Sequence, residues 1–232
     1  MVRVLAVHAY TFCMLTSRRP APVSYLSHVA GLYQAQNVFG RDGTGLTIID
    51  VDGWTAESKK TGTPVGFRLP DRARADCTAP DVEGIPSCQV RQRTLDVLGA
   101  LSVCLAITSG WVILAEDDCE PCPGALSEAL DALAGLSPTG TSMAKLSSNM
   151  CATAFPAAKV PDYSNDTLAR LYTHPHDIIM AENWAGPETQ VYRHNRNLWH
   201  HIGNVSTEKL KNTPEWQALY AAMRTDTCFD RI

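Results

Sequence analysis

The feature that most constrains this chain is a hydrophobic run that ends in three consecutive carboxylates, Trp111-Val-Ile-Leu-Ala-Glu-Asp-Asp118. An apolar run bounded by polar residues is typical of a buried strand. Three adjacent anions at its tip repel one another unless a cation neutralises them. Hard divalent cations take oxygen ligands and often bridge carboxylates to nucleotide phosphates. Because open α/β sheets bind ligands at the carboxyl ends of their strands, the run predicts a nucleotide site there.

Length and charge narrow the class of protein further. The chain has 232 residues, of which 45% are hydrophobic, enough for one domain with a sizeable core. Its 20 basic and 24 acidic residues include no basic block that would follow a nucleic-acid backbone, so nucleic acid is not an expected partner. Residues 1–8 show neither a signal pattern nor a membrane segment. We expect a soluble chain, either cytoplasmic or the catalytic piece of a longer Golgi or ER-lumenal enzyme.

The eight cysteines leave the compartment open. Cys77 and Cys88 flank a loop that contains Pro and Gly and are candidates for a disulfide. Cys104 lies in an apolar run and is expected to be a buried free thiol. The segment Cys119-Glu-Pro-Cys122 has metal-site spacing without a second pair at zinc-finger distance, so a local disulfide or two loop thiols is favoured over zinc.

Two segments match the N-glycosylation sequon, Asn165-Asp-Thr167 and Asn204-Val-Ser206. They matter only if the chain passes through a secretory lumen, and chance matches are common.

Strand and helix patterns alternate along the chain, as a mainly parallel sheet requires. The first strand is expected to end at a polar break at Tyr10 and Thr11. The segment 54–87 shows little periodicity and is expected to be a long surface excursion. The predicted strands are 2–8, 46–51, 111–115 and 143–148, and the predicted helices are 25–36, 89–109, 125–136 and 166–172. The fold class is therefore α/β, with a mainly parallel central sheet flanked by helices.

Four spaced motifs resemble one enzyme family. They are Arg91-Gln-Arg-Thr-Leu-Asp96 before a helix, the strand into Glu116-Asp-Asp118, Pro175-His-Asp177, and Leu198-Trp-His-His-Ile-Gly203. In this order they resemble metal-dependent glycosyltransferases of the GT-A fold, most closely the inverting group that includes N-acetylglucosaminyltransferase IV and the GPI-anchor N-acetylgalactosamine transferase. The resemblance implies one Rossmann-like domain over 1–232, with a nucleotide-sugar-binding half at 1–118 and an acceptor-binding half at 119–232.

The resemblance also implies Mn²⁺ or Mg²⁺ held against the diphosphate of a nucleotide sugar, with a UDP-sugar as the expected donor. Asp118 is the expected metal ligand, and Glu116 or Asp117 is expected to face the ribose or the sugar. The alternative is a solvated acidic turn. His201 is the second expected ligand, because enzymes of this family place a histidine near the ion in a late His-hydrophobic-Gly step, and imidazole suits Mn²⁺. Alternation along an extended segment sends neighbouring His200 to the opposite side, so only one of the two can serve.

An inverting transfer needs a base that takes the proton from the attacking hydroxyl of a glycan or glycoconjugate acceptor. Asp177 is the expected base, although its position after Pro175 suits an N-terminal helix cap equally well. Glu182 is the substitute.

The donor nucleotide is expected over the end of the first strand, edged by Ala9, Tyr10 and Thr11. Family members carry a similar Arg and Asp at the start of the long helix, so Arg91 and Asp96 are expected donor contacts. A salt bridge between them on the helix surface is the alternative.

Two other classes of function compete with the transferase. A metal-dependent nucleotidyltransferase or phosphohydrolase also wants carboxylates at a strand end, but usually needs two metals and further acidic ligands. A sugar- or Ca²⁺-binding module would recruit more widely spaced oxygens than this cluster offers.

Overall fold

The computed structural model describes residues 7–17, 25–40, 43–51, 66–68, 73–78, 85–147, 151–185 and 190–202, with 214 and 228. Its strands are β1 His8–Thr16, β2 Thr44–Asp50, β3 Gly66–Arg68, β4 Thr108–Glu116, β5 Cys119–Pro121, β6 Met143–Lys145, β7 Ala152–Pro156, β8 Val191–Arg193 and β9 Trp199–His201. Its helices are α1 Leu26–Ala35, α3 Cys88–Leu105, α4 Ala125–Ala134, α5 Val160–Ala169 and α6 His176–Ala185, with a 3₁₀ turn, η1, at Ala157–Lys159.

Seven strands form one mixed sheet in the order β3-β2-β1-β4-β7-β6-β8. The pairs β1–β2, β1–β4, β2–β3 and β6–β8 are parallel, while β7 runs antiparallel to both of its neighbours. The strands β1, β2 and β4 therefore end at the same side of the sheet, which we call the carboxyl edge. The predicted α/β class with a mainly parallel sheet is confirmed.

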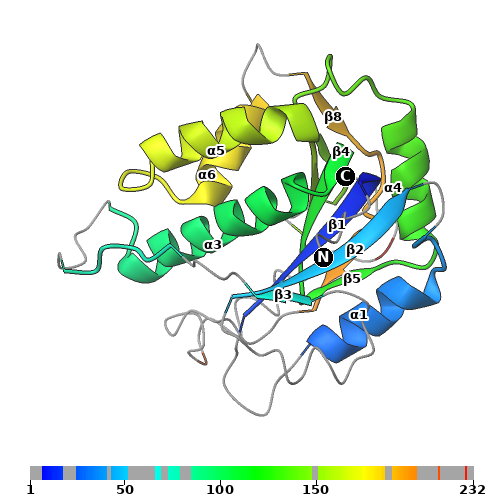
Figure 1. Ribbon diagram of the computed structural model, residues 1–232, viewed down its shortest axis with the longest axis horizontal. Helices are drawn as coiled ribbons and strands as arrows, with labels where there is room; N and C mark the ends of the chain where they lie inside the picture. The colour runs from blue at the N-terminus through cyan, green and yellow to red at the C-terminus, as the bar shows by residue number, and fades with distance from the viewer. Residues whose placement is uncertain are drawn as a thin grey trace, which may run out of the picture.

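Helices cover both faces of this sheet (Figure 1), with α3, α5 and α6 on one face and α1 and α4 on the other. Each face has its own apolar core. On the α1 side, Trp199 donates its indole N–H to the hydroxyl of Tyr33 at 2.8 Å, and both side chains are fully buried. This contact fixes the first residue of β9 against α1, so it helps to position the residues that follow Trp199.

The long helix that leads into the carboxylate strand was predicted correctly as α3. Ser87 caps it by accepting a hydrogen bond from the Val90 N–H at 3.3 Å. Its buried residues include Val97, Leu101 and Cys104, which pack on the sheet.

The first strand was predicted too early. Residues 1–6 lie outside the described part of the chain, and β1 runs through the expected break at Tyr10 and Thr11 to Thr16. The break fails because the Thr11 hydroxyl is satisfied inside the sheet, accepting a hydrogen bond from Thr108 at 2.7 Å. The strand β7 was not predicted, and α5 begins earlier than the predicted helix at 166–172.

All eight cysteines, each within the described residues, are paired. The predicted disulfide Cys77–Cys88 is present. The prediction of a free thiol at Cys104 is wrong, because packing of α3 on β1 brings Cys104 against Cys13, 91 residues away, and the two are bonded.

The Cys-x-x-Cys segment forms no local bridge either. Cys119 bonds to Cys151, and Cys122 bonds to Cys228. The two cysteines of that segment therefore link β5 and the residue after it to distant parts of the chain.

Candidate functional site

The three consecutive carboxylates lie at the carboxyl edge, where they turn toward different elements. Glu116 forms a salt bridge with Arg93 of α3 at 2.6 Å. Asp117 accepts a hydrogen bond from the hydroxyl of Thr16, the last residue of β1, at 2.5 Å. Glu116 and Asp117 therefore already have partners within the protein.

Asp118 faces the other way, toward the ribbon formed by β5 and β9. These strands are antiparallel with Cys119 opposite His201, and the Ile202 N–H donates to the Asp118 carbonyl oxygen at 2.9 Å. This register places the His201 Nε2 3.5 Å from the Asp118 Oδ2. His200 is opposite Glu120, so of the two neighbouring histidines it is His201 that meets Asp118.

Asp118, Cys119 and His201 have potential ligand atoms that lie within 4.8 Å of one another. The Cys119 sulfur is bonded to Cys151, so it offers no thiolate. Of this group, the described residues therefore supply one carboxylate and one imidazole. This set suits Mn²⁺, and Mg²⁺ less well, because both ions leave several positions to phosphate oxygens and water, and imidazole suits the softer ion better.

Glu116 is held in its ionised form beside this pair. Burial alone would raise its pKa, and the neighbouring Asp118 carboxylate acts in the same direction. The Arg93 guanidinium outweighs both and holds the pKa of Glu116 below its ordinary value. The Glu116 carboxylate therefore remains charged at neutral pH.

The predicted nucleotide contacts Ala9, Tyr10 and Thr11 lie at the start of β1, not at its end. Six residues of extended strand, roughly 20 Å, separate Tyr10 from Thr16. The first strand was predicted to end before Tyr10, so the rule that ligands bind at the carboxyl ends of strands was applied to residues that in fact begin β1. Thr16 and Asp50, both buried, end β1 and β2 at this edge beside the carboxylates of β4. The sequence signal for each was a polar residue that closes an apolar run.

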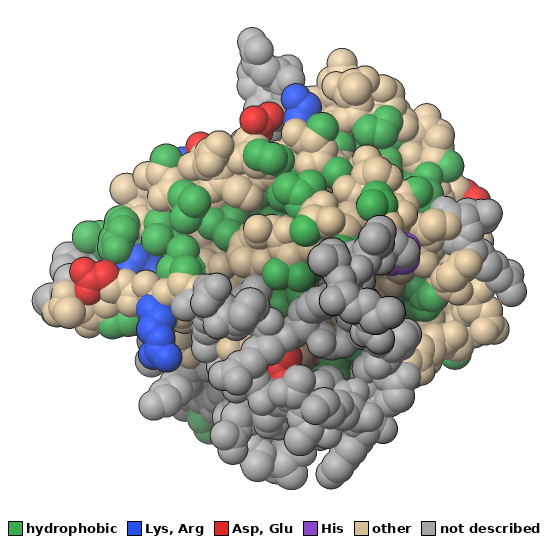
Figure 2. Space-filling model, in the orientation of Figure 1, with side chains coloured by type: hydrophobic (Ala, Val, Ile, Leu, Met, Phe, Trp, Pro, Cys, Tyr) green, Lys and Arg blue, Asp and Glu red, His purple; other side chains and the backbone are tan. Residues whose placement is uncertain are grey.

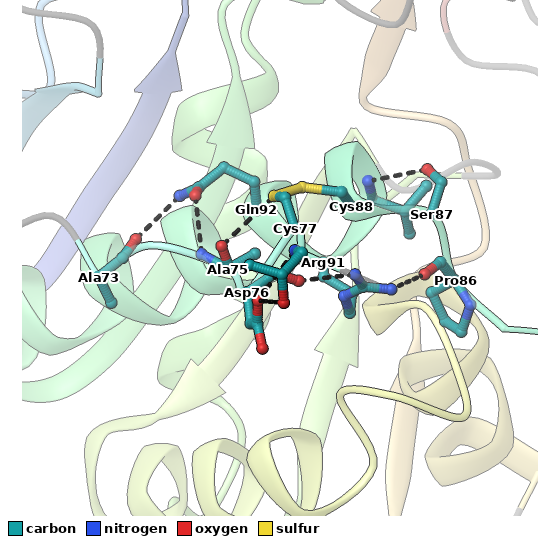
Figure 3. The surroundings of a disulfide bond; sticks show 11 residues. Ala73, Ala75, Asp76, Cys77, Pro86, Ser87, Cys88, Arg91 and Gln92 are labelled. Carbon is teal, nitrogen blue, oxygen red and sulfur yellow. Dashed lines mark hydrogen bonds between the residues drawn. A yellow bond between two sulfur atoms is a disulfide. The ribbon is translucent and has the colours of Figure 1, made fainter. Parts of the chain in front are cut away.

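Arg91 occupies a structural position at the start of α3 (Figure 3). Its guanidinium donates to the carbonyl oxygens of Pro86 at 2.5 Å and Asp76 at 2.8 Å, and it lies 5.1 Å from the ring centroid of Tyr172. The residue is only 3% exposed. Its guanidinium holds the main chain on both sides of the Cys77–Cys88 disulfide.

Asp96 belongs to the same arrangement. It accepts a hydrogen bond from the Gln92 side chain at 3.0 Å. Gln92 in turn donates to the Ala73 carbonyl and accepts from the Ala75 N–H (Figure 3). The described hydrogen bonds of Arg91 and of Gln92, which also donates to Asp96, thus attach the segment 73–78 to α3. The role of Arg91 and Asp96 as donor contacts stays a prediction.

The two predicted bases lie on α6. Asp177 is exposed, and its Oδ1 accepts a hydrogen bond from the next main-chain N–H, that of Ile178, at 2.9 Å. Glu182 forms a salt bridge with Arg170. The hydrogen bond from Arg170 lowers the pKa of Glu182, which makes that carboxylate a weaker base. Asp177 therefore remains the better candidate of the two.

Comparison with known proteins gives the fold. No protein-family model matches the chain, and no curated protein is similar to it in sequence. Among solved structures, 4-diphosphocytidyl-2C-methyl-D-erythritol synthase from Anaerococcus prevotii DSM 20548 has a TM-score of 0.52 and 8% identity, over 93% of this chain and 96% of its own. The overall fold is therefore shared with this enzyme.

Two further structures are similar at a lower level. A putative nucleotide-diphospho-sugar transferase from Desulfovibrio desulfuricans G20 has a TM-score of 0.47 and 13% identity, over 81% of this chain and 80% of its own. Galactosyltransferase LgtC, in complex with donor and acceptor sugar analogs, has a TM-score of 0.49 and 10% identity, over 80% and 73%.

Proposed function

We propose that this chain is an inverting, metal-dependent glycosyltransferase that moves a sugar from a UDP-sugar to a hydroxyl of a glycan or glycoconjugate. The observation that carries the proposal is the meeting of Asp118 and His201, 3.5 Å apart, at the carboxyl edge of the sheet. The two residues are 83 positions apart in the sequence, and β5–β9 pairing brings them together. Their chemistry is that of an open cation site.

Asp118 and His201 are the residues that would hold Mn²⁺ or Mg²⁺. A divalent cation bound there supplies positive charge that stabilises the departing nucleoside diphosphate without proton transfer. The half 1–118 provides the other donor groups, with Thr16, Asp50 and Glu116 as the polar residues that reach the same edge.

Asp177 is the proposed base, in the acceptor-binding half 119–232. Its carboxylate is exposed at the start of α6 and takes the proton from the acceptor hydroxyl as that oxygen attacks the anomeric carbon. Glu182 is a poorer second choice, because Arg170 pairs with it and lowers its pKa.

A nucleotidyltransferase is the alternative that the fold favours, since the cytidyl-compound synthase matches almost the whole chain. The two functions differ in the leaving group. A glycosyltransferase releases UDP, whereas a nucleotidyltransferase that uses a nucleoside triphosphate and a sugar phosphate releases pyrophosphate.

The deciding experiment measures UDP and pyrophosphate release in parallel, with a panel of UDP-sugars and a panel of nucleoside triphosphates with sugar phosphates. Each panel is assayed with EDTA and again after Mn²⁺ is restored. UDP release that EDTA stops and Mn²⁺ restores supports the transferase. Pyrophosphate release instead would assign the nucleotidyltransferase, and no binding or turnover of either panel would leave a non-catalytic module.

We also propose that the chain works in an oxidising compartment, such as a secretory lumen. Four disulfides with no free cysteine are rare in cytosolic proteins, where thiols are kept reduced. Across the described ranges, no helix has the length and apolar character needed to cross a bilayer.

A further inference from the structure

The helix α5 carries an unexplained combination of features on its outer surface. Asn165 is exposed, and it begins the sequon Asn165-Asp-Thr167. Leu168 of α5 and Tyr172, in the turn that follows the helix, are 49% and 52% exposed, which is high for side chains of this type. Figure 2 shows hydrophobic side chains gathered over the face formed by α3, α5 and α6.

The four disulfides indicate the compartment in which this sequon can be glycosylated. A sequon is used only in a chain that enters a secretory lumen, and the same compartment permits disulfides to form and persist. The bridges Cys13–Cys104 and Cys119–Cys151 lie in the fold's two cores, so oxidation belongs to the folded state and is not confined to a surface loop.

We propose that Asn165 carries an N-linked glycan and that this glycan covers the exposed side chains of Leu168 and Tyr172. The donor is an oligosaccharide on a polyprenyl pyrophosphate. The Asn165 side-chain nitrogen forms a bond to the anomeric carbon of the first sugar, and the bond from that carbon to the pyrophosphate oxygen breaks. The polyprenyl pyrophosphate leaves with the bonding electrons, and the amide proton passes to the base of the host glycosylation enzyme.

The fold accommodates this modification at Asn165 without rearrangement. The Asn165 side chain points to solvent, so a sugar attached there displaces no core residue. Thr167, which the glycosylation enzyme must read, is fully buried in the folded protein. The sequon is therefore read on the unfolded nascent chain, before α5 packs.

The test is to express the full chain through a eukaryotic secretory route and to map its peptides after enzymatic removal of N-glycans in ¹⁸O-labelled water. The expected result is an ¹⁸O-labelled Asp at position 165, lost in Asn165→Gln and retained in Thr167→Ser. Asn204→Gln is the matched control, because it removes the second sequon, which lies outside the described residues. An unmodified Asn165 in protein with all four disulfides formed overturns the proposal.

A separate measurement tests whether the glycan covers Leu168 and Tyr172. Native removal of the glycan is expected to increase binding of a hydrophobic dye and self-association, and Leu168→Ser with Tyr172→Ser is expected to abolish that increase. Dye binding and self-association that stay the same after deglycosylation refute the covering role. Since α5 is not part of the proposed site, turnover of Asn165→Gln should match that of the unmutated protein, and a failure of the proposed transferase activity does not affect this result.

Discussion

The β5–β9 ribbon and the start of α3 both present charged residues that the motifs marked as functional, yet the structure uses them differently. At the ribbon, Asp118 and His201 meet across two strands, and each adds a potential metal ligand. At the start of α3, Arg91 donates to two main-chain carbonyls and holds the segment 73–78 in place. Charged motif residues therefore form a potential reaction site at the ribbon, whereas at the start of α3 a charged motif residue stabilises the fold.

What separates the two regions is the identity of the partner atoms. A guanidinium that is 3% exposed and bound to main-chain carbonyls is already engaged in holding the chain together. A carboxylate that faces an imidazole across a ribbon offers lone pairs to the same point in space, as a metal site requires. Mutations in the two regions should therefore separate activity from stability.

The largest expected effect is that of Asp118→Ala. Loss of the carboxylate removes one of two protein ligands, so turnover should fall by about 10³-fold or more, and Mn²⁺-dependent UDP binding should disappear. Isothermal titration with UDP, with and without Mn²⁺, checks the binding. Asp117→Ala is the matched control, since Asp117 bonds Thr16, and its UDP binding should still depend on Mn²⁺. Full Mn²⁺-dependent binding by Asp118→Ala would remove the metal assignment.

Asp177→Asn is expected to reduce transfer by about 10²- to 10⁴-fold, the usual contribution of a general base. Its UDP affinity should stay unchanged, because the residue lies on α6 and is not placed in the donor site. Transfer to an acceptor and UDP binding are measured on the same preparation. Glu182→Gln is the control and should retain most activity. A fully active Asp177→Asn enzyme would disprove the base assignment.

The sequence predicted the ribbon site better than it predicted the donor site, for a physical reason. Asp118 and His201 were marked by residue type and by the resemblance to the GT-A family, and strand pairing brings them together. Tyr10 and Thr11 were misplaced because a buried threonine pair, Thr11 with Thr108, looks like a polar break until its partner is known. The disulfide partner of Cys104 was hidden in the same way, since it depends on how α3 packs on β1.

Arg91→Met tests the other region. Two charge-assisted hydrogen bonds to main-chain carbonyls are lost, so the free energy of unfolding should fall by about 3 kcal/mol, while Mn²⁺-dependent UDP affinity is unchanged. Denaturant unfolding and titration measure the two quantities. Arg93→Met, two residues along the same helix, is the matched control. Because Arg93 pairs with Glu116 at the carboxyl edge, that variant should weaken UDP binding more than it lowers stability. If Arg91→Met weakens UDP binding instead, Arg91 is a donor contact after all.

The smallest expected effect is that of a mutation at Glu128. This charged residue belongs to neither region, so it serves as a reference for mutations in both. Glu128 on α4 pairs with His194 at 2.8 Å and with Arg196. Burial alone would raise its pKa, but the hydrogen bonds from His194 and Arg196 hold the pKa below its ordinary value of 4.5. A lowered folded-state pKa contributes stability that is present above pH 4.5 and is lost as the pH falls through the folded-state pKa.

Glu128→Gln should therefore lower the free energy of unfolding at pH 7 by less than about 1 kcal/mol, as partly exposed ion pairs do. The difference from the unmutated protein should shrink below pH 4.5. Urea unfolding at a series of pH values measures it. A difference that stays constant with pH would mean that Glu128 stabilises the fold by packing and not by its charge. UDP binding by Glu128→Gln should be normal, since a purely structural ion pair, like Arg91 and unlike Asp118, affects only the fold.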